Sequence, residues 1–231
     1  SSFLTQVSIV VIMAVMNNVL VIYGAGSKYG ADIPMTVVGI VMKVFQIVIS
    51  VVVGIAAGAQ PIVGYNYGAG LWRRVKLIFR TMMAAEFSVG LVSLICFEVF
   101  PVQIISVFGS EDGLYNEFAV LAFRVFLGGI VLCCIQKSCS IFLQSMGKPA
   151  LSMLLSLLRD FVLSVPLTLV LPRFFGVTGA LYSGPAADVI SFGAAVLCMA
   201  AVFRKLNRLE DGEVALSGAS QGGLAVERKI C

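Results

Sequence analysis

Six ionisable side chains lie inside long apolar stretches of this sequence, and their types and spacing could do chemistry. They are Lys43, Glu86, Arg124, Arg159, Asp160 and Asp188. At about 1.5 Å of rise per helical residue, each would lie near the middle of a membrane-spanning helix. Ionised groups at that depth are expensive, and they normally face one another or a water-filled cavity. Three bases and three acids therefore predict pairing, and Arg159 with Asp188 is the first ion pair that we expect.

Two kinds of chemistry are open to these groups. Ion pairs could lock the helices together, and removing one partner would then leave a lone buried charge that destabilises the fold. Alternatively, a buried carboxyl group could bind and release a proton or another ion. The candidates for such proton or ion binding are Glu86, Asp160 and Asp188, and of these Glu86 and Asp160 are the better ones because the sequence offers them no obvious partner.

Polar residues in the first two apolar stretches and in the fourth could line a substrate cavity. Side chains that can form hydrogen bonds are unfavourable in lipid, so they face protein or water. Close packing between helices is the alternative, because small residues such as Gly54 share a helical face with Lys43 and Gln46. The substrate-cavity candidates are Asn17, Asn18, Lys43, Gln46 and Arg124.

The same inventory argues against an enzyme. The chain has no histidine, and its six cysteines form no CxxC pair. We therefore expect no catalytic residue, no metal site and no cofactor, because a nucleophile with a base, a metal cluster or paired catalytic carboxylates would be needed. The net charge of +4 comes from bases in short segments between apolar runs, a pattern that favours membrane topology over nucleic-acid binding.

The elements that must position these side chains are membrane helices. The chain has a mean hydropathy of +1.02 and 12% charged residues, whereas soluble domains carry about 25%. Uncharged stretches exceed the roughly 20 residues that cross a bilayer. The sequence predicts an all-α integral membrane protein, a six-helix transmembrane lobe in residues 1–203 followed by a disordered polar tail in residues 204–231. The expected spans are residues 3–23, 33–62, 75–100, 114–144, 150–171 and 174–203.

Lysine and arginine mark one set of connecting segments, which predicts the orientation. One set holds Arg73, Arg74, Lys76, Lys148, Arg204, Lys205 and Arg208; the other holds Lys28 and Arg173 together with Asp32, Glu111 and Asp112. By the positive-inside rule the first set is cytoplasmic, so both termini lie on the cytoplasmic side of a cell membrane. The chain begins Ser-Ser-Phe without an initiator methionine, and we expect it to be a fragment.

One long motif stands at the end of the second span. It reads Gly-Ala-Gln-Pro-Ile-Val-Gly-Tyr-Asn-Tyr-Gly-Ala-Gly from Gly58 to Gly70, followed by Arg73-Arg74-Val75. This closely resembles the signature of the MATE (multidrug and toxic compound extrusion) family, and the bacterial MepA-like branch in particular. Three further segments match in order: Gln144 to Pro149, Arg159 with Pro166, and Gly176 to Ala180 leading to Pro185 and Asp188. Within the first motif, Gly58, Gln60, Pro61, Asn66 and Gly68 are interpreted as structural, because proline and asparagine terminate helices and glycine allows close approach.

The resemblance implies that the chain is the C-terminal lobe, helices 7–12, of a twelve-helix transporter. Such a transporter exports drugs and organic cations in exchange for Na⁺ or H⁺, by alternating access between two lobes. Its partners would be the N-terminal lobe, the lipid bilayer, a cationic or amphipathic substrate and the coupling ion, with no nucleic acid. The sequence departs from the family in one respect. Some branches of the family place an acidic cation ligand on helix 7 and another on helix 10, which correspond to the first and fourth spans here. The first span has no acid, and the fourth has Arg124 with no acid at comparable depth, which disfavours a sodium site of the family type in this lobe.

Two other functions stay open. A flippase for lipid-linked precursors belongs to the same superfamily, and it should have a strongly cationic cavity to hold a pyrophosphate. The balanced charges of this lobe favour the exporter over that alternative. A membrane scaffold subunit without transport activity is the other, because a half-length protein could act in that way.

Overall fold

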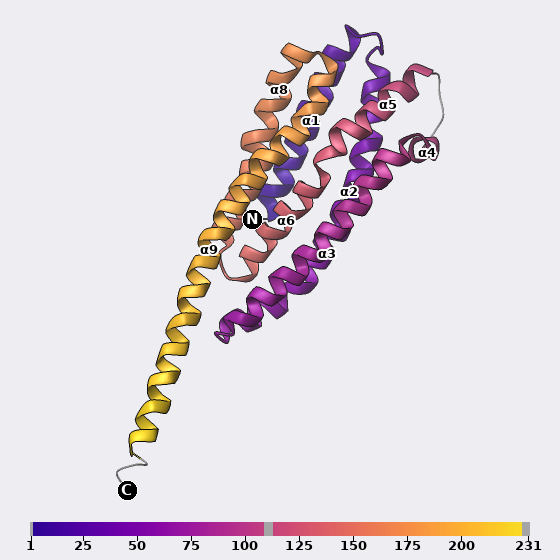
Figure 1. Ribbon diagram of the computed structural model, residues 1–231. Helices are drawn as coiled ribbons and strands as arrows, with labels where there is room; N and C mark the ends of the chain where they lie inside the picture. Colours follow the sequence, from indigo (N-terminus) through magenta and orange to yellow (C-terminus); the bar gives the residue numbers. More distant parts are fainter. Residues whose placement is uncertain (1, 109–112, 228–231) are drawn as a thin grey trace.

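The computed structural model describes the backbone of residues 2–108 and 113–227 and the side chains of residues 7–108 and 113–212. In these ranges the chain is a bundle of long helices without a strand (Figure 1). The elements are α1 (Ser2–Ala25), α2 (Asp32–Gly68), α3 (Trp72–Val99), α4 (Pro101–Ser106), α5 (Gly113–Phe126), the 3₁₀ turn η1 (Leu127–Gly129), α6 (Ile130–Ser145), α7 (Pro149–Leu157), the π-helical turn η2 (Leu158–Leu163), α8 (Ser164–Phe175) and α9 (Val177–Glu227).

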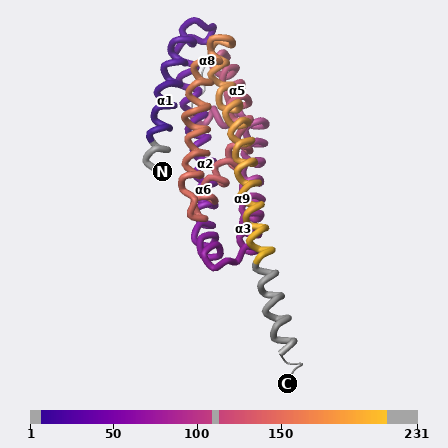
Figure 2. Tube along the Cα trace, turned by 90° about the vertical axis from the view of Figure 1, so that its left-hand side faces the viewer, coloured from indigo at the N-terminus to yellow at the C-terminus, as the bar shows by residue number. Residues whose placement is uncertain are grey.

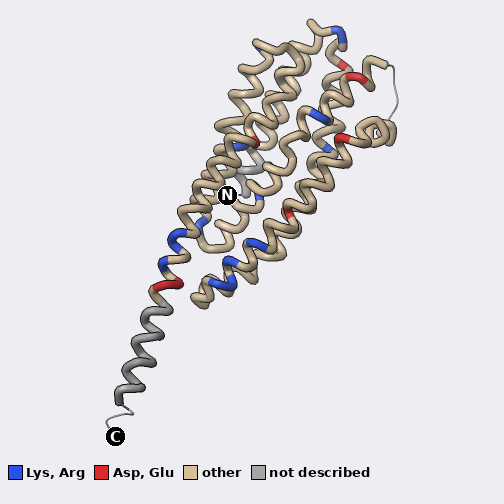
Figure 3. Tube along the Cα trace, in the orientation of Figure 1, with Lys and Arg blue, Asp and Glu red and all other residues tan. Residues whose placement is uncertain are grey.

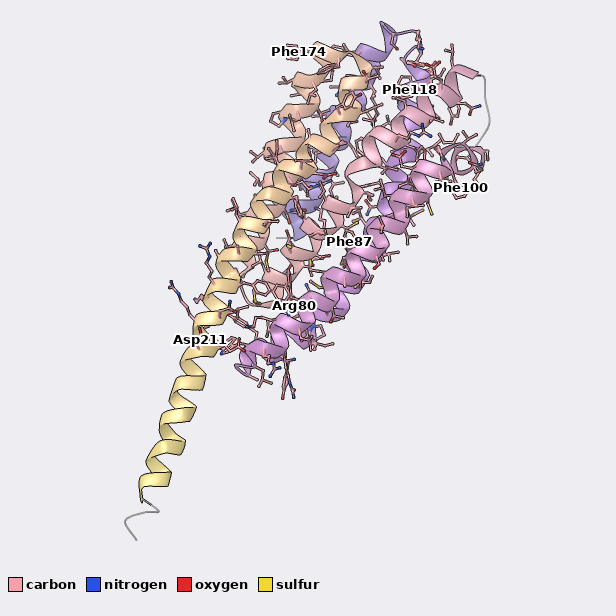
Figure 4. All side chains as sticks on the ribbon, in the orientation of Figure 1. Arg80, Phe87, Phe100, Phe118, Phe174 and Asp211 are labelled. Atoms are coloured by element: carbon pink, nitrogen blue, oxygen red, sulfur yellow. The ribbon has the colours of Figure 1, made fainter. Side chains whose placement is uncertain are left out.

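Six helical segments in the described ranges are long and apolar enough to cross a membrane, which confirms the predicted fold class. They are Val7–Ala25, Asp32–Gly68, Trp72–Val99, Gly113–Ser145, Pro149–Phe175 and Val177–Gly212. Phe87, Phe100 and Phe174 point away from the bundle, whereas Phe118 is enclosed in it (Figure 4). Large apolar side chains on the outside of a bundle suit a lipid environment.

The spans run alternately up and down, and α1 packs beside α8 and α2 (Figure 2). Lysine and arginine gather near the end of the bundle that holds the α2–α3 and α6–α7 connections (Figure 3). At this end, burial and the neighbouring Lys205 lower the pKa of Lys148. The basic segments that the sequence assigned to one side of the membrane therefore share one end of the bundle.

The sequence predicted that Pro61 ends or kinks the second span, and the structure shows that it does not end it. Helix α2 continues past it to Gly68. Tertiary packing holds the last turns in place, because Val63 and Asn66 are buried and Asn66 Nδ2 donates a hydrogen bond to the Ile62 carbonyl at 2.7 Å. The turn to α3 follows at Gly70, whose φ of 73° is a conformation that favours glycine.

The predicted break at residue 203 is also absent, since α9 continues as one helix to Glu227. Leu206 is buried against the bundle, and Lys76 of α3 forms an ion pair with Glu210 and a hydrogen bond with Asn207. The ring of Phe79 lies 4.9 Å from that of Phe203. The polar composition of this segment predicted disorder, whereas these contacts with α3 keep residues 204–210 helical.

Candidate functional site

A cavity of about 450 Å³ lies between α1, α2, α6 and the α7–α8 span. Its volume is typical of sites for small organic molecules. The apolar part of its lining is rich in methionine and isoleucine: Ile9, Ile12, Met13, Met16, Met42, Ile49 and Met153. The polar part of the lining carries charges and hydroxyl groups: Lys137, Ser140, Ser152, Ser156, Arg159, Asp160, Ser164, Thr168 and Ser183. The cavity is therefore amphipathic.

Helical periodicity explains the polar part of the lining. Lys137, Ser140 and Gln144 are three, four or seven residues apart in α6, so their side chains share one face. Ser152 and Ser156 repeat the spacing in α7, and Thr168 Oγ1 donates a hydrogen bond to Ser183 Oγ of α9 at 3.0 Å. Six hydroxyl groups thus surround the charged residues.

Four charged residues form one network beneath the hydroxyl groups. Arg159 Nη2 lies 2.7 Å from Asp188 Oδ1, and Arg159 Nη1 lies 2.7 Å from Asp160 Oδ1. Lys137 Nζ approaches Asp160 Oδ2 at 2.9 Å. The side chains of Asp160 and Asp188 are each 3% exposed, whereas those of Lys137 and Arg159 are 16% and 12% exposed. The network has two positive and two negative charges, and its bases are the members nearer to the open space.

The ring of Phe45 covers the network from α2, with its centroid 5.9 Å from Arg159 Cζ. An arginine over an aromatic face is attracted by the ring quadrupole. Phe45 also packs edge-on against Phe126, whose ring lies 6.3 Å away. These two rings fix the guanidinium at the bottom of the cavity.

A π-helical turn positions the two adjacent charges Arg159 and Asp160. Both lie in η2, where Ser164 Oγ donates a hydrogen bond to the Arg159 carbonyl at 2.8 Å, five residues back. Helix α8 starts at Ser164, directly after this turn, and Pro166 is its third residue. Pro166 lacks the N–H that would bond to the carbonyl of Val162. Single π-helical turns of this kind are rare and are frequently found at functional sites.

The structure brings Arg159 and Asp188 together, as the sequence predicted. It contradicts the premise about Asp160, which was expected to lack an obvious partner and instead contacts both Lys137 and Arg159. Glu86 has no ion pair among the described side chains, and it is fully buried between α3 and α6. The prediction that all six charges lie together is therefore wrong, because the network consists of Lys137, Arg159, Asp160 and Asp188.

Of the five cavity candidates, Gln46 alone lines this cavity in the part of the chain that the structure describes. Asn17 and Asn18 are exposed on α1, and Lys43 is exposed on α2. Arg124 is exposed in the last turn of α5, where its Nε lies 3.4 Å from Glu98 Oε2. Depth along the chain placed these residues correctly within spans, but it does not reveal which face of the helix turns inward.

Lys137 and the hydroxyl groups were missed by the sequence reasoning. Lys137 stands in the uncharged stretch between Arg124 and Lys148, so the rule that singles out buried charges applies to it as well. The hydroxyl groups gave no comparable signal, because serine and threonine are common in membrane helices, where they pack or bond to their own backbone.

The family motif lies away from the cavity, at the end of α2. Gly58 and Gly68 have no close neighbour among the described atoms, whereas a Cβ on Gly64 would lie 3.4 Å from the Ser145 carbonyl oxygen. Gln60 and Pro61 lie in the last turns of α2, and the Asn66 carbonyl accepts a hydrogen bond from the Leu71 N–H at 2.9 Å. These contacts are consistent with a structural role of Asn66 in the turn that leads to α3.

Comparisons with known proteins agree with this architecture. The sequence model of the MatE family matches residues 3–170. No curated protein matches the chain. Among solved structures, an outward-facing multidrug resistance MATE family transporter of the MOP superfamily is 17% identical with a TM-score of 0.77, and the match covers 89% of this chain and 44% of that one. A MATE structure in the straight conformation gives a TM-score of 0.79 at 17% identity, covering 89% and 45%.

A third solved structure is a MOP superfamily transporter from Pyrococcus furiosus Vc1, for which a reverse polarity of the binding pocket suggests a different function. It is 17% identical with a TM-score of 0.72, and the match covers 90% of this chain and 45% of that one. The chain thus spans less than half the length of the solved structures that it matches. The family model matches most of the sequence and the fold agrees with that of solved MATE structures, so the chain belongs to the MATE family.

Proposed function

We propose that this chain is the C-terminal lobe of a secondary antiporter that exports drugs and organic cations in exchange for Na⁺ or H⁺. The observation that carries the proposal is the amphipathic cavity of about 450 Å³, with its methionine-rich lining and a charge network that is neutral as a whole. Unbranched methionine side chains adapt to ligands of different shape. A few polar groups in a largely apolar cavity fix the orientation of a bound molecule.

Protonation of the network would couple to substrate binding in the direction of an exchange. A proton on Asp160 removes one of the two negative charges and leaves Lys137 and Arg159 in excess. A cationic substrate is then repelled, and it binds again once the proton leaves. Asp188 contributes by holding Arg159 in place.

A second lobe would complete the transport path. Asn17, Asn18 and Lys43 are exposed at depths where lipid is unfavourable for polar groups. A face of this kind suits the cleft opposite the N-terminal lobe. In this arrangement both termini lie on the cytoplasmic side of the cell membrane, because an even number of spans returns the chain to the side that the basic connecting segments mark.

Ethidium efflux tests whether one lobe suffices. The purified chain, reconstituted in proteoliposomes with an imposed proton or sodium gradient, is expected to show no efflux above protein-free vesicles, because alternating access needs two lobes. The same preparation should bind tetraphenylphosphonium, which shows that the cavity is intact. Robust efflux by the chain alone would contradict the half-transporter and would show that two copies form the path.

The flippase alternative is favoured by one observation, the greater exposure of Lys137 and Arg159 than of their acidic partners. Tetraphenylphosphonium and tetraphenylborate separate the two functions, because they share a shape and differ in the sign of their charge. The exporter predicts tighter binding of the cation, and the flippase predicts tighter binding of the anion.

The variant Lys137→Met sharpens this comparison. Removing the ammonium leaves Asp160 with one partner, so binding of tetraphenylphosphonium should become about tenfold tighter, which corresponds to about 1.4 kcal/mol. Lys43→Met is the matched control, since Lys43 lies on the exposed face outside the cavity and its loss should leave the affinity unchanged. Equilibrium dialysis in nanodiscs measures both. Weaker binding of the cation by Lys137→Met, or an equal change in the control, would contradict the assigned cavity.

A further inference from the structure

Glu86 lies in the middle of α3, on the side of α6 that faces away from the cavity. The residue is 0% exposed, and neither carboxyl oxygen has a hydrogen-bond partner among the described residues. On α6, the Ser138 hydroxyl and the Cys134 thiol face the carboxyl group. Lys137, which binds Asp160 across the cavity, is the residue next to Ser138.

The seam between α3 and α6 is closed tightly around this carboxyl group. Met82, Glu86 and Gly90 form a buried stripe at intervals of four residues on α3. A Cβ on Gly90 would lie 3.1 Å from the Val131 Cα, so the two backbones approach closely one turn away from Glu86. In this arrangement of the helices the carboxyl group is not exposed to solvent.

No charge in these surroundings compensates a carboxylate. Within residues 7–108 and 113–212 no ion pair involves Glu86, and Ser138 and Cys134 are neutral at ordinary pH. An isolated ionised carboxylate in an apolar site is so unfavourable that the group takes up a proton instead. Asp160 and Asp188 differ, because bases stay bonded to them.

We propose that Glu86 is a proton-binding site, a neutral carboxylic acid at rest that releases its proton when α3 and α6 separate and water enters. The O–H bond of the acid breaks, the proton passes to water, and the carboxylate remains until the helices close again. The seam offers one carboxyl and one hydroxyl group, too few oxygens to replace the hydration shell of Na⁺. The ligand of this site is therefore the proton.

The position of α6 links this site to the cavity. Lys137 and Ser138 are consecutive residues of α6, and their side chains point about 100° apart around the helix. A rotation of α6 that follows substrate binding at Lys137 therefore also moves Ser138 relative to Glu86. This link between the cavity and Glu86 rests on the proposed antiport and adds a proton-binding residue to it. The protonation of Glu86 at rest does not depend on transport.

Infrared spectroscopy of the chain in nanodiscs at pH 7 tests the resting state. Wild type should show the C=O stretching band of a protonated carboxylic acid, and Glu86→Gln should lose it while keeping its thermal stability, because the amide has the shape of the neutral acid. Asp160→Asn is the control and should keep the band. Ser138→Ala keeps the carboxyl group, and it should shift the band if Glu86→Gln does not fold. A difference spectrum in which Glu86→Gln removes carboxylate bands would overturn the proposal.

Transport assays separate this site from the antiport itself. In a reconstituted transporter that contains this lobe, Glu86→Gln should weaken the dependence of ethidium efflux on the proton gradient without removing it, because Asp160 of the charge network is still present. Efflux with unchanged dependence would remove Glu86 from coupling and leave the proposed exporter standing. Absence of efflux in wild type, with the acid band present and lost in Glu86→Gln, would overturn the exporter and support the proton site.

Discussion

Asp188→Asn is expected to destabilise the chain by about 3–5 kcal/mol, the range found when one partner of a buried ion pair is removed. The substitution leaves Lys137 and Arg159 with a single negative charge, that of Asp160, in the interior of the bundle. The asparagine retains the shape of the side chain, so cavity formation does not contribute. Helical circular dichroism during titration with sodium dodecyl sulfate in mixed micelles measures the free energy of unfolding.

Arg159→Met should be as destabilising as Asp188→Asn, and the double variant less so than either. Removing both residues leaves Lys137 opposite Asp160, a balanced pair. Exchanging the two residues is a less clean test, because it would put two aspartates side by side at positions 159 and 160. Arg124→Met is the control: its partner Glu98 and Arg124 itself are 45% and 54% exposed, and such pairs contribute about 0–1 kcal/mol. A double variant whose loss equals the sum of the single losses would show that the pair is not coupled.

Gly179→Ala is expected to be at least as disruptive as a typical overpacked core substitution, which costs about 1–3 kcal/mol. A Cβ on Gly179 would lie 2.4 Å from the carbonyl oxygen of Leu171 and 2.7 Å from the nitrogen of Pro172. These are backbone atoms, so no side-chain rotation relieves the overlap. The start of α9 would have to move away from the end of α8, and the fraction of folded, monodisperse protein after heating should fall sharply in size-exclusion chromatography.

Gly193→Ala provides the matched control in the same helix. Gly193 is exposed, and a Cβ there meets nothing within 4 Å. Alanine favours the helix over glycine by about 0.5–1 kcal/mol in exposed positions, so this variant should be as stable as wild type or slightly more stable. Equal losses in the two variants would mean that the α8–α9 contact does not set the stability.

The six spans were predictable because lipid imposes a minimum length and an apolar composition on each of them, and both can be recognised in a single sequence. The Arg159–Asp188 pair was predictable for a related reason, since buried charges seek partners. The motif Gly176 to Ala180 was recognisable as a pattern, and the structure supplies its cause. Gly176 has φ 62° and ψ −146°, a region that glycine occupies almost alone, and Gly179 touches the α8 backbone.

The cavity and its network were less predictable because helix rotation is set by contacts between spans. Lys43 and Lys137 look alike in the sequence, yet one is exposed on α2 and the other binds Asp160. The π-helical turn at Arg159 adds an offset that a period of 3.6 residues does not contain. The helical end of α9 depends on Lys76, more than a hundred residues away in the chain.

The wide turn from Leu158 to Leu163 also bears on how this span should be matched to its relatives. A regular helix covers the same rise with one residue fewer, and each residue turns the helix by about 100°. A gapless alignment with a relative that has a regular helix at this point would therefore turn every later side chain of the span by about 100° around the helix axis. Homology models of related transporters should therefore be allowed a single-residue gap here, and residues chosen for crosslinking or labelling beyond it should be taken from the shifted register.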